Sequence, residues 1–379
     1  MDRRTFLEAA LAAAAAPALG ALPRPAAGPL LLVGTYTEGK RAEGVYAFRM
    51  DPGTGALAPL GASDVGRDPS FLALHPRRPV VYAVNEVEQY GGEAGGGVAA
   101  FAVDPATGAL SPLGRGRPTG GGAPCYVSVD PAGDCLMVAN YVGGNVAFFA
   151  LGADGAPGER VRLDQHAGTG PRADRQEKAH AHSVVPDPSG HWAVSADLGA
   201  DRLYVYALGD RAPAAPAVAT RPGTGPRHLA FDATGRFLYA VGELDLTATA
   251  YRFDPASGAL TALQTVPLVE GAPGGERTAA DVHLAPSGRF LYASVRGDDV
   301  LAVFAVDPAS GALTFVERVP TGGHWPRNFG LDPSGRFLFA ANQRSNTLVG
   351  FRVDQTTGRL TPNGVRVEVP APVCVRFVG

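Results

Sequence analysis

One phrase recurs along the chain and constrains its fold more than any other feature. It has the form Asp/His-Pro-x-Gly-Arg-Phe-Leu-Tyr-Ala, and successive copies lie 45 to 57 residues apart. The copies are anchored at His75-Pro76, Asp130-Pro131, Asp187-Pro188, Asp232-Ala233, Ala285-Pro286 and Asp332-Pro333. Repeats of roughly 40 to 50 residues, only slightly shorter than these, are typical of β-propeller blades. The repeat therefore predicts an all-β propeller.

Two further phrases accompany the first and set the number of blades. An alternating strand ending in Asp-Pro-x-Thr/Ser-Gly-Ala-Leu starts its turn at Asp51, Asp104, Asp254 and Asp307, with a variant at Asp354 and weaker strand copies at 145–150 and 203–208. A short apolar strand precedes each anchor, at 70–74, 126–129, 183–185, 228–231, 281–284 and 328–331, and recurs at 373–377. Proline fixes φ and glycine accepts positive φ, so each phrase forms a turn. The second and third phrases each occur seven times and the first occurs six times, which predicts seven blades of four antiparallel strands.

The two ends of the repeat predict how the ring closes. Residues 373–377 form a first strand with no second strand after it, and residues 30–33 form a second strand with no first strand before it. Pairing these segments in one blade removes the free sheet edges that an open ring would expose. We therefore assign residues 29–379 to a single seven-bladed propeller, and the high counts of glycine (50) and proline (33) agree with a turn-rich fold.

Residues 1–28 share nothing with the repeat. Arg3-Arg4 is followed by Phe6-Leu7 and a weakly apolar, alanine-rich stretch, which resembles a twin-arginine export signal. Cleavage after Ala16, Ala18 or Ala27 would fit this pattern. We therefore expect a protein that is exported to the periplasm or the extracellular space and whose mature form has no membrane span.

Charge and cysteine content exclude several classes of partner. A net charge of −3 disfavours binding to nucleic acid. The three cysteines have no metal-type spacing. Equal-register pairing around Pro131 would place Cys125 near Val138, so we expect no disulfide between Cys125 and Cys135. We expect a monomer with no cofactor and no bound metal.

The register of the repeat locates a candidate site. The first strand starts where the second strand ends, so both positions lie at the same end of each blade. The first strand is normally the innermost strand of a propeller, so these positions ring one mouth of the central channel, which is a concave place for a ligand. They are occupied by Ser70, Cys125, His182, Arg227, Ala280 and Arg327, and by Glu86, Tyr141, Leu198, Glu243, Arg296 and Gln343.

The charged members of this ring suit an anionic or carbonyl substrate. Histidine transfers protons near neutral pH, and arginine binds carboxylate or phosphate through two parallel hydrogen bonds. Alternation along the strand places His180 and His182 on the same face. The candidate catalytic residues are His182, His180, Arg227, Glu243 and Arg296, and the candidate substrate-binding residues are Arg327, His228, Asp197, Glu86, Asn140 and Tyr141.

Several of these residues also have a purely structural interpretation. Arg296 and Arg327 would serve equally as ion-pair partners of Asp298, Asp299 or Glu243. For His228, a hydrogen bond to a neighbouring blade is the favoured interpretation, and His166 is expected to be solvated. Four residues recur in register as turn residues that hold loops through side-chain-to-backbone bonds: Asn85, Asn140, Asp197 and Asn342.

At these motifs the sequence resembles the seven-bladed propeller lactonase family, which includes one type of 6-phosphogluconolactonase and the fungal carboxymuconate cyclases. The resemblance runs from about Leu31 to Phe377. The phrases that carry it are Val33-Gly34-Thr35-Tyr36-Thr37, Pro69-Ser70-Phe71-Leu72, Ala139-Asn140-Tyr141, His180-Ala181-His182-Ser183, Ala196-Asp197-Leu198-Gly199, Gly225-Pro226-Arg227-His228 and Gly242-Glu243-Leu244.

This resemblance implies opening of a lactone ring, or its reverse, without a metal. The family's proposed catalytic histidine corresponds to His180 or His182, its two arginines to Arg227 and Arg296, and its glutamate to Glu243. The chain departs from the family pattern at Tyr126, where histidine is common, and at Gly242 and Val295, where asparagine is common. A phosphorylated sugar lactone is a cytoplasmic metabolite, which fits poorly with an export signal.

The working hypothesis is hydrolysis of a lactone. His182 or His180 acts as general base on water, Arg227 and Arg296 bind the substrate carboxylate or the oxyanion, and Glu243 orients an arginine or supplies a proton. No Gly-x-Ser-x-Gly elbow indicates a serine nucleophile.

Two alternatives stay open. The oxygen ligands of Asn85, Asn140, Asp197, Asn342, Glu86 and Glu243 would suit a calcium-dependent lactonase, although Arg227 and Arg296 would bring positive charge to the metal. The other alternative is a binding propeller of the cell envelope that has no catalytic activity.

Overall fold

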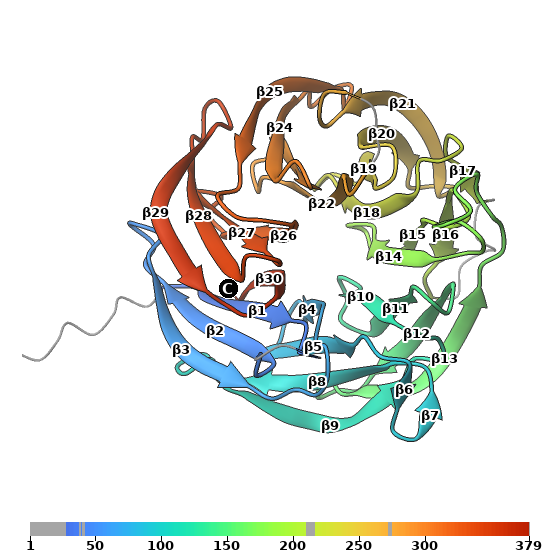
Figure 1. Ribbon diagram of the computed structural model, residues 1–379. Coiled ribbons are helices and arrows are strands. Elements are labelled where there is room, and N and C mark those ends of the chain that lie inside the picture. Colours follow the sequence, from blue (N-terminus) through green and yellow to red (C-terminus); the bar gives the residue numbers. More distant parts are fainter. Residues whose placement is uncertain (1–27, 38, 40–41, 210–216, 272–274, 379) are drawn as a thin grey trace, which may run out of the picture.

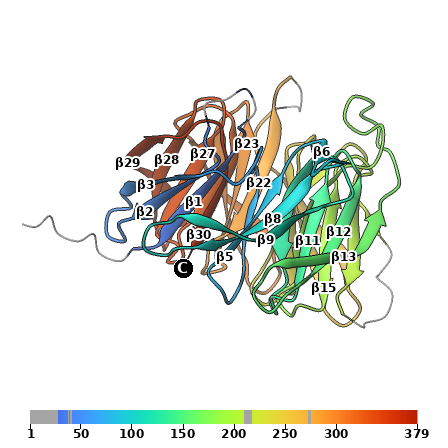
Figure 2. The ribbon, with the colours of Figure 1, turned by 90° about the horizontal axis from the view of Figure 1, so that it is seen from below.

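Four-stranded antiparallel sheets surround a central channel, as Figure 1 shows along its axis. The computed structural model describes residues 28–37, 39, 42–209, 217–271 and 275–378. In this part of the chain there are seven such sheets, numbered here as blades 1 to 7. Figure 2 shows the ring edge-on, with the strands running between its two faces. The predicted seven-bladed propeller is confirmed.

The strands of each blade follow one another from the axis outward. Blade 1 contains β30 (Pro372–Val378), β1 (Leu30–Thr35), β2 (Val45–Met50) and β3 (Leu57–Ser63). Blade 2 contains β4 (Leu72–Leu74), β5 (Val80–Asn85), β8 (Gly97–Val103) and β9 (Leu110–Pro118), with a small hairpin of β6 (Gln89–Tyr90) and β7 (Glu93–Ala94) between β5 and β8. Blade 3 contains β10 (Pro124–Val129), β11 (Cys135–Asn140), β12 (Asn145–Leu151) and β13 (Pro157–Gln165).

The remaining blades repeat this order. Blade 4 contains β14 (Ala181–Pro186), β15 (Trp192–Asp197), β16 (Arg202–Ala207) and β17 (Val218–Ala219). Blade 5 contains β18 (Pro226–Phe231), β19 (Phe237–Gly242), β20 (Thr247–Asp254) and β21 (Ala259–Pro267). Blade 6 contains β22 (Thr278–Leu284), β23 (Phe290–Arg296), β24 (Val300–Val306) and β25 (Leu313–Pro320). Blade 7 contains β26 (Pro326–Leu331), β27 (Phe337–Asn342), β28 (Thr347–Val353) and β29 (Leu360–Glu368).

Blade 1 joins the two ends of the described chain. Strand β30 pairs antiparallel with β1, with Leu31 opposite Phe377 and Val33 opposite Val375. The predicted closure by complementary half-units is therefore confirmed. The inner strands β30, β4, β10, β14, β18, β22 and β26 contact one another around the channel.

The recurring phrases interlock neighbouring blades, which explains why they repeat. The Tyr239 hydroxyl of blade 5 donates a hydrogen bond to the Gly311 carbonyl of blade 6 at 3.1 Å. Gly311 has a φ of +75°, and a Cβ there would lie 2.4 Å from the Phe237 ring. The same bond joins Tyr82 to Gly155 and Tyr292 to Gly358. The tyrosine of the Gly-Arg-Phe-Leu-Tyr-Ala phrase in one blade thus donates a hydrogen bond to the turn glycine between the outer strands of the next blade.

The predicted position of Cys125 opposite Val138 was wrong. Tyr126 pairs with Ala139 and Pro124 with Asn140, so Cys125 lies at a bulge in β10 and not opposite Val138. The error has a simple cause: the turn spans residues 130–135, closed by a hydrogen bond from the Asp130 amide to the Cys135 carbonyl, and is longer than equal-register pairing assumed. The three cysteines are free thiols, as expected.

The predicted export signal, residues 1–28, falls almost wholly outside the described residues, since only Gly28 lies within them. Among the described residues, no helix is long and apolar enough to cross a membrane.

Candidate active site

A cavity of about 370 Å³ lies where the inner strands begin and their partner strands end. This is the mouth of the channel that the repeat register indicates. The lining side chains carry four arginines and three glutamates, so the mouth is net positive. The lining residues are Glu86, Cys125, Tyr141, Arg175, His182, Glu243, Gly275, Glu276, Thr278, Arg296, Trp325, Arg327 and Arg344.

A larger cavity of about 790 Å³ lies near the Asp-Pro-x-Gly turns, among blades 1, 2 and 7. Two of its arginines are already occupied by backbone carbonyls. Arg49 donates to Gly28 and Ala106, and Arg336 donates to Pro52. Catalytic groups do not converge there, so we place the site at the other cavity.

Glu243 is the centre of the site's charge network. Its carboxylate lies 2.6 Å from Arg175, 2.8 Å from Arg227 and 3.0 Å from Arg296. The three arginines hold the pKa of Glu243 well below its usual range, although burial opposes them. Burial lowers the pKa of Arg296 to about 9, against the opposing effect of Glu243. Glu243 is therefore a permanent anion that aligns arginines, and it has no proton to give.

The guanidinium groups of Arg296 and Arg344 both lie over the indole ring of Trp325. Arg344 lies 3.5 Å above the Trp325 ring centroid and Arg296 lies 5.4 Å from it. Trp325 has a φ of +69°, and the residues at the equivalent position of other blades, Ala123 and Ala371, also have positive φ, so this conformation belongs to the repeat. Glu276 accepts a hydrogen bond from Arg344 at the rim. The Trp325 indole thus contacts the guanidinium groups of two arginines.

Glu86 and Arg327 form a second polar group in the cavity wall. The hydroxyls of Tyr36 and Ser70 both donate to one oxygen of Glu86, Oε2. Arg327 donates to the Tyr36 hydroxyl at 2.9 Å and lies over the same ring. Burial raises the pKa of Glu86, although Arg327 opposes the effect. Unlike Glu243, Glu86 is suited to carry a proton.

His182 lies in the cavity wall beside three polarizable groups. Its Nδ1 is 3.7 Å from the Cys125 sulfur, and its ring meets those of Tyr141 and His228 edge-on. Burial, with help from Arg227, holds the pKa of His182 well below its usual range. The imidazole is therefore neutral at neutral pH and has a lone pair available to accept a proton.

His180 lies behind the cavity and not in its wall. Its ring stacks on Tyr141 at 4.5 Å, its Nδ1 is 3.0 Å from the Tyr141 carbonyl and its Nε2 is 3.0 Å from Glu177. The register of β14 shifts between Ala181 and Ser183, so the expected alternation of the two histidines is interrupted. Of the two candidates, His182 is the one that faces the substrate space.

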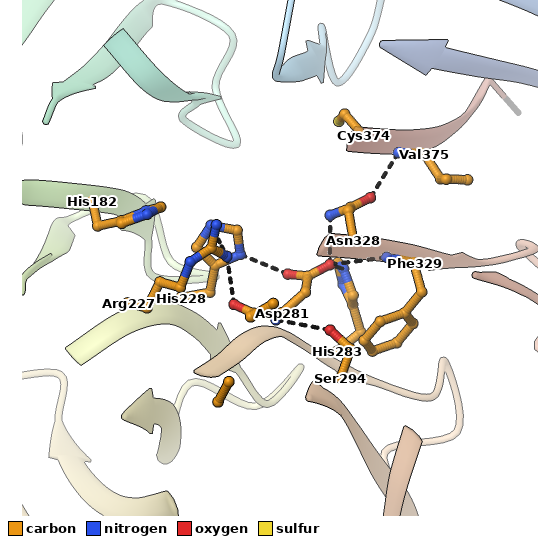
Figure 3. Close-up of polar contacts among 12 residues, drawn as sticks. His182, Arg227, His228, Asp281, His283, Ser294, Asn328, Phe329, Cys374 and Val375 are labelled. Atoms are coloured by element: carbon orange, nitrogen blue, oxygen red, sulfur yellow. Dashed lines mark hydrogen bonds and ion pairs between the residues drawn. The ribbon is translucent and has the colours of Figure 1, made fainter. Parts of the chain in front are cut away.

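Arg227 and His228 are adjacent residues of β18, and Figure 3 shows them between His182 and Asp281. Arg227 is buried, pairs with Glu243 and donates to the Ala280 carbonyl. His228 Nδ1 is 2.6 Å from Asp281 of the next blade. The favoured interpretation of His228, a hydrogen bond to a neighbouring blade, is confirmed. Arg227 is not among the residues that line the cavity, and its contact with that group of residues runs through Glu243.

Two residues that were predicted to bind substrate instead form hydrogen bonds within the protein. Asp197 is fully buried and accepts from the amides of His180 and Ala200. Asn140 is also fully buried and donates to Asn145 at 2.7 Å. Neither lines the cavity. Asp197 therefore holds the loop after β15, and Asn140 spans the loop between β11 and β12.

The expectation that His166 is solvated was wrong. His166 is buried, its Nδ1 lies 2.7 Å from Asp197, and its ring stacks on Tyr204 at 3.7 Å. The sequence around it is irregular, but Tyr204 and Tyr206 lie two residues apart on β16 and present one aromatic face to it.

The family follows from comparison with known proteins. The model of the family described as "Lactonase, 7-bladed beta-propeller" matches residues 30–377. The chain belongs to this lactonase family. The 6-phosphogluconolactonase of Bacillus subtilis (strain 168) is 37% identical over 348 residues, which cover 91% of this chain and 97% of that protein.

Other relatives agree with this assignment. The 6-phosphogluconolactonase of Formosa agariphila is 32% identical over 294 residues, which cover 76% of this chain and 81% of that protein. The solved structure of the periplasmic gluconolactonase of Pseudomonas aeruginosa is similar with a TM-score of 0.84 and 37% identity, covering 93% of this chain and 99% of that one.

Several residues of this lactonase site were missed by sequence reasoning. Arg175 lies in an irregular stretch that has no counterpart in the repeat, so the register could not find it. Trp325 and Arg344 lie next to register positions, and Trp325-Pro326 follows the same pattern as Gly225-Pro226. Tyr36, which contacts both Glu86 and Arg327, was visible only within the motif Val33 to Thr37.

The donor set of this site does not suit calcium. Three arginines surround Glu243 and would bring positive charge to a metal ion bound there. Among the described residues, no group of three His, Cys, Asp or Glu side chains is arranged to hold a metal ion.

Proposed function

We propose that this lactonase hydrolyses an anionic lactone in the cavity at the channel mouth, by a mechanism that uses side chains and no metal. The observation that carries the proposal is the meeting of a neutral His182 with four cavity-lining arginines. Family membership supports the reaction class. The names of its relatives support a sugar lactone as substrate.

The first step is attack of water on the lactone carbonyl. His182 takes a proton from the water, and the hydroxide adds to the carbonyl carbon. Negative charge then develops on the carbonyl oxygen. Arg296, aligned by Glu243 and Trp325, is placed to stabilise this oxyanion. Such pre-aligned donors supply a large share of catalysis because they need no reorganisation as the charge forms.

The second step breaks the ring bond and needs a proton for the leaving alkoxide. Glu86 is suited to donate it, since burial raises the pKa of Glu86. Glu243, which the sequence analysis considered for this role, is held ionised by its arginines. The proton gained by His182 returns through solvent to Glu86, so the net reaction adds one water to the lactone.

The charge of the cavity indicates the substrate class. Arg327 and Arg344 remain to bind a carboxylate or phosphate on the substrate while Arg296 serves the oxyanion. We further propose export of the protein, because Arg3-Arg4 and the alanine-rich stretch resemble a twin-arginine signal. A periplasmic relative agrees with this proposal. A carboxylated lactone fits an exported monomeric enzyme better than a phosphorylated one.

A titration at constant pH on matched lactones tests the proposal. 6-Phosphogluconolactone and a carboxylated muconate-type lactone are each compared with an uncharged lactone of the same ring size, which for 6-phosphogluconolactone is gluconolactone. We expect turnover of the lactones, with a lower KM for the anionic members. Turnover of none of them would favour a binding propeller of the envelope. Equal KM values for charged and uncharged lactones would refute the assignment of the arginines.

A further inference from the structure

A buried carboxylate lies in the channel beneath the cavity and is not used by the mechanism above. Asp281, on β22, is almost completely buried. Figure 3 shows its side chain between the histidines of blades 4 and 5 and the inner strands of blades 7 and 1. The Ser294 hydroxyl accepts a hydrogen bond from the Asp281 backbone amide at 3.1 Å, which fixes the backbone at Asp281.

The two carboxylate oxygens of Asp281 have different hydrogen-bond partners. Oδ1 lies 2.6 Å from His228 Nδ1. Oδ2 lies 2.8 Å from His283 Nε2 and accepts from the Asn328 side chain and from the Phe329 amide. Asn328 in turn accepts from the Val375 amide at 2.7 Å. One oxygen thus faces the active-site side, and the other is held by three donors on the opposite side.

The contact with Asp281 sets the tautomer of His228. A proton on Nδ1 is donated to the carboxylate, which leaves the lone pair of Nε2 facing Arg227 Nη1 at 3.2 Å. The other tautomer would turn an N–H toward the N–H of Arg227. Burial, together with Arg227, lowers the pKa of His228 to about 3, so the ring is neutral.

The His228 ring touches two parts of the active site. It contacts Arg227, whose guanidinium pairs with Glu243, and it meets the His182 ring edge-on at 5.3 Å. We infer that Asp281 is a positioning residue of the active site: by fixing the tautomer and orientation of His228, it holds Arg227 and His182 in place for lactone opening. The kinetic part of this inference rests on the proposed function.

Asp281→Asn separates positioning from packing because it keeps the shape of the side chain. The new amide must direct its NH2 group at one of the two sides. On the Oδ2 side it would face three donors, so it turns toward His228, which must then move its proton to Nε2. The Nε2–H of His228 would then face an N–H of Arg227, and the two donors would repel each other. Loss of the hydrogen-bond partner of a metal-bound histidine typically costs about 10- to 100-fold in activity, and we expect a kcat loss of similar size here, with KM nearly unchanged.

Nitrogen NMR of the histidine side chains provides a readout that needs no substrate. In the wild type we expect His228 as the Nδ1–H tautomer, and in Asp281→Asn as the Nε2–H tautomer. The matched control is His283→Gln, which loses a contact to the same carboxylate from the opposite side. It should keep kcat within about twofold and leave the His228 tautomer unchanged, whatever its effect on melting temperature.

A second variant applies if Asp281→Asn fails to fold. His228→Phe preserves the ring that packs on Phe71 and Tyr126 but removes both nitrogens. A kcat loss similar to that expected for Asp281→Asn supports the inference, and unchanged kcat overturns it. An Nε2–H tautomer of His228 in the wild type also overturns it. Failure of the wild type to open any lactone would refute the proposed function, while the NMR result would still decide the tautomer.

Discussion

Glu243→Gln removes the one negative charge that three arginines share. The side chains of Arg227 and Arg296 are almost fully buried and cannot turn outward, whereas Arg175, with 31% of its side chain exposed, can do so. Removing one partner from a buried ion pair typically costs about 3–5 kcal/mol, because the remaining charge is left uncompensated. We therefore expect the free energy of unfolding at pH 7 to fall by about 4 kcal/mol. Catalysis should fall as well, by about 100-fold in kcat, because Arg296 loses its alignment.

The pH dependence of this loss has a definite sign. The pKa of Glu243 is lower in the folded state than in the unfolded state, where it is about 4.3. Its contribution to stability is complete above the unfolded pKa and is lost as pH falls toward the folded pKa. The difference between wild type and Glu243→Gln should therefore be full at pH 7 and clearly smaller at pH 3. Urea unfolding at the two pH values measures it.

Glu159→Gln is the matched control for Glu243→Gln. Glu159 forms one ion pair with Arg117 on an outer strand, and its side chain is 85% exposed. Exposed pairs of this kind contribute roughly 0–1 kcal/mol. If Glu243→Gln is as stable as this control at pH 7, the charge network does not stabilise the fold. If it keeps wild-type kcat, Glu243 does not align Arg296 for catalysis.

The remaining predictions concern the proton-transfer groups and the blade contacts. His182→Gln should lower kcat by about 100-fold or more with little change in melting temperature, whereas His180→Gln should lower kcat by less than about tenfold. The pH profile of kcat/KM should have its acidic limb well below pH 6.5, because the pKa of His182 is lowered, and Glu86→Gln should remove the alkaline limb. Tyr239→Phe should cost about 1 kcal/mol of unfolding free energy through the lost bond to Gly311, with activity unchanged, as urea unfolding and kinetics would show.

The fold was readable from the sequence because its signals repeat. The turn phrases recur from blade to blade, and the half-units at 30–33 and 373–377 are complementary in only one way. The same repetition gave a register that placed His182, Glu243 and Arg296 around one cavity. Local errors came where the register was interrupted, as at the bulge that moves Cys125 and the shift between Ala181 and Ser183.

The parts of the site that the sequence did not predict lie outside the repeat. Arg175 reaches Glu243 from an irregular loop, so no spacing rule indicates it. His166 is buried by tyrosines on an outer strand, which a polar flanking sequence conceals. The opposite pKa shifts of Glu86 and Glu243 depend on which arginines surround each carboxylate in space. Such partners are set by packing and not by sequence distance.

The central claim is that Arg296 and its neighbours open a lactone without a metal. The most direct test is kcat/KM of wild type and Arg296→Gln on one lactone, measured with excess chelator. We predict that wild-type turnover survives the chelator and that Arg296→Gln is at least about 100-fold slower. Wild-type turnover that the chelator abolishes and calcium restores, or equal turnover by the two proteins, would contradict the account.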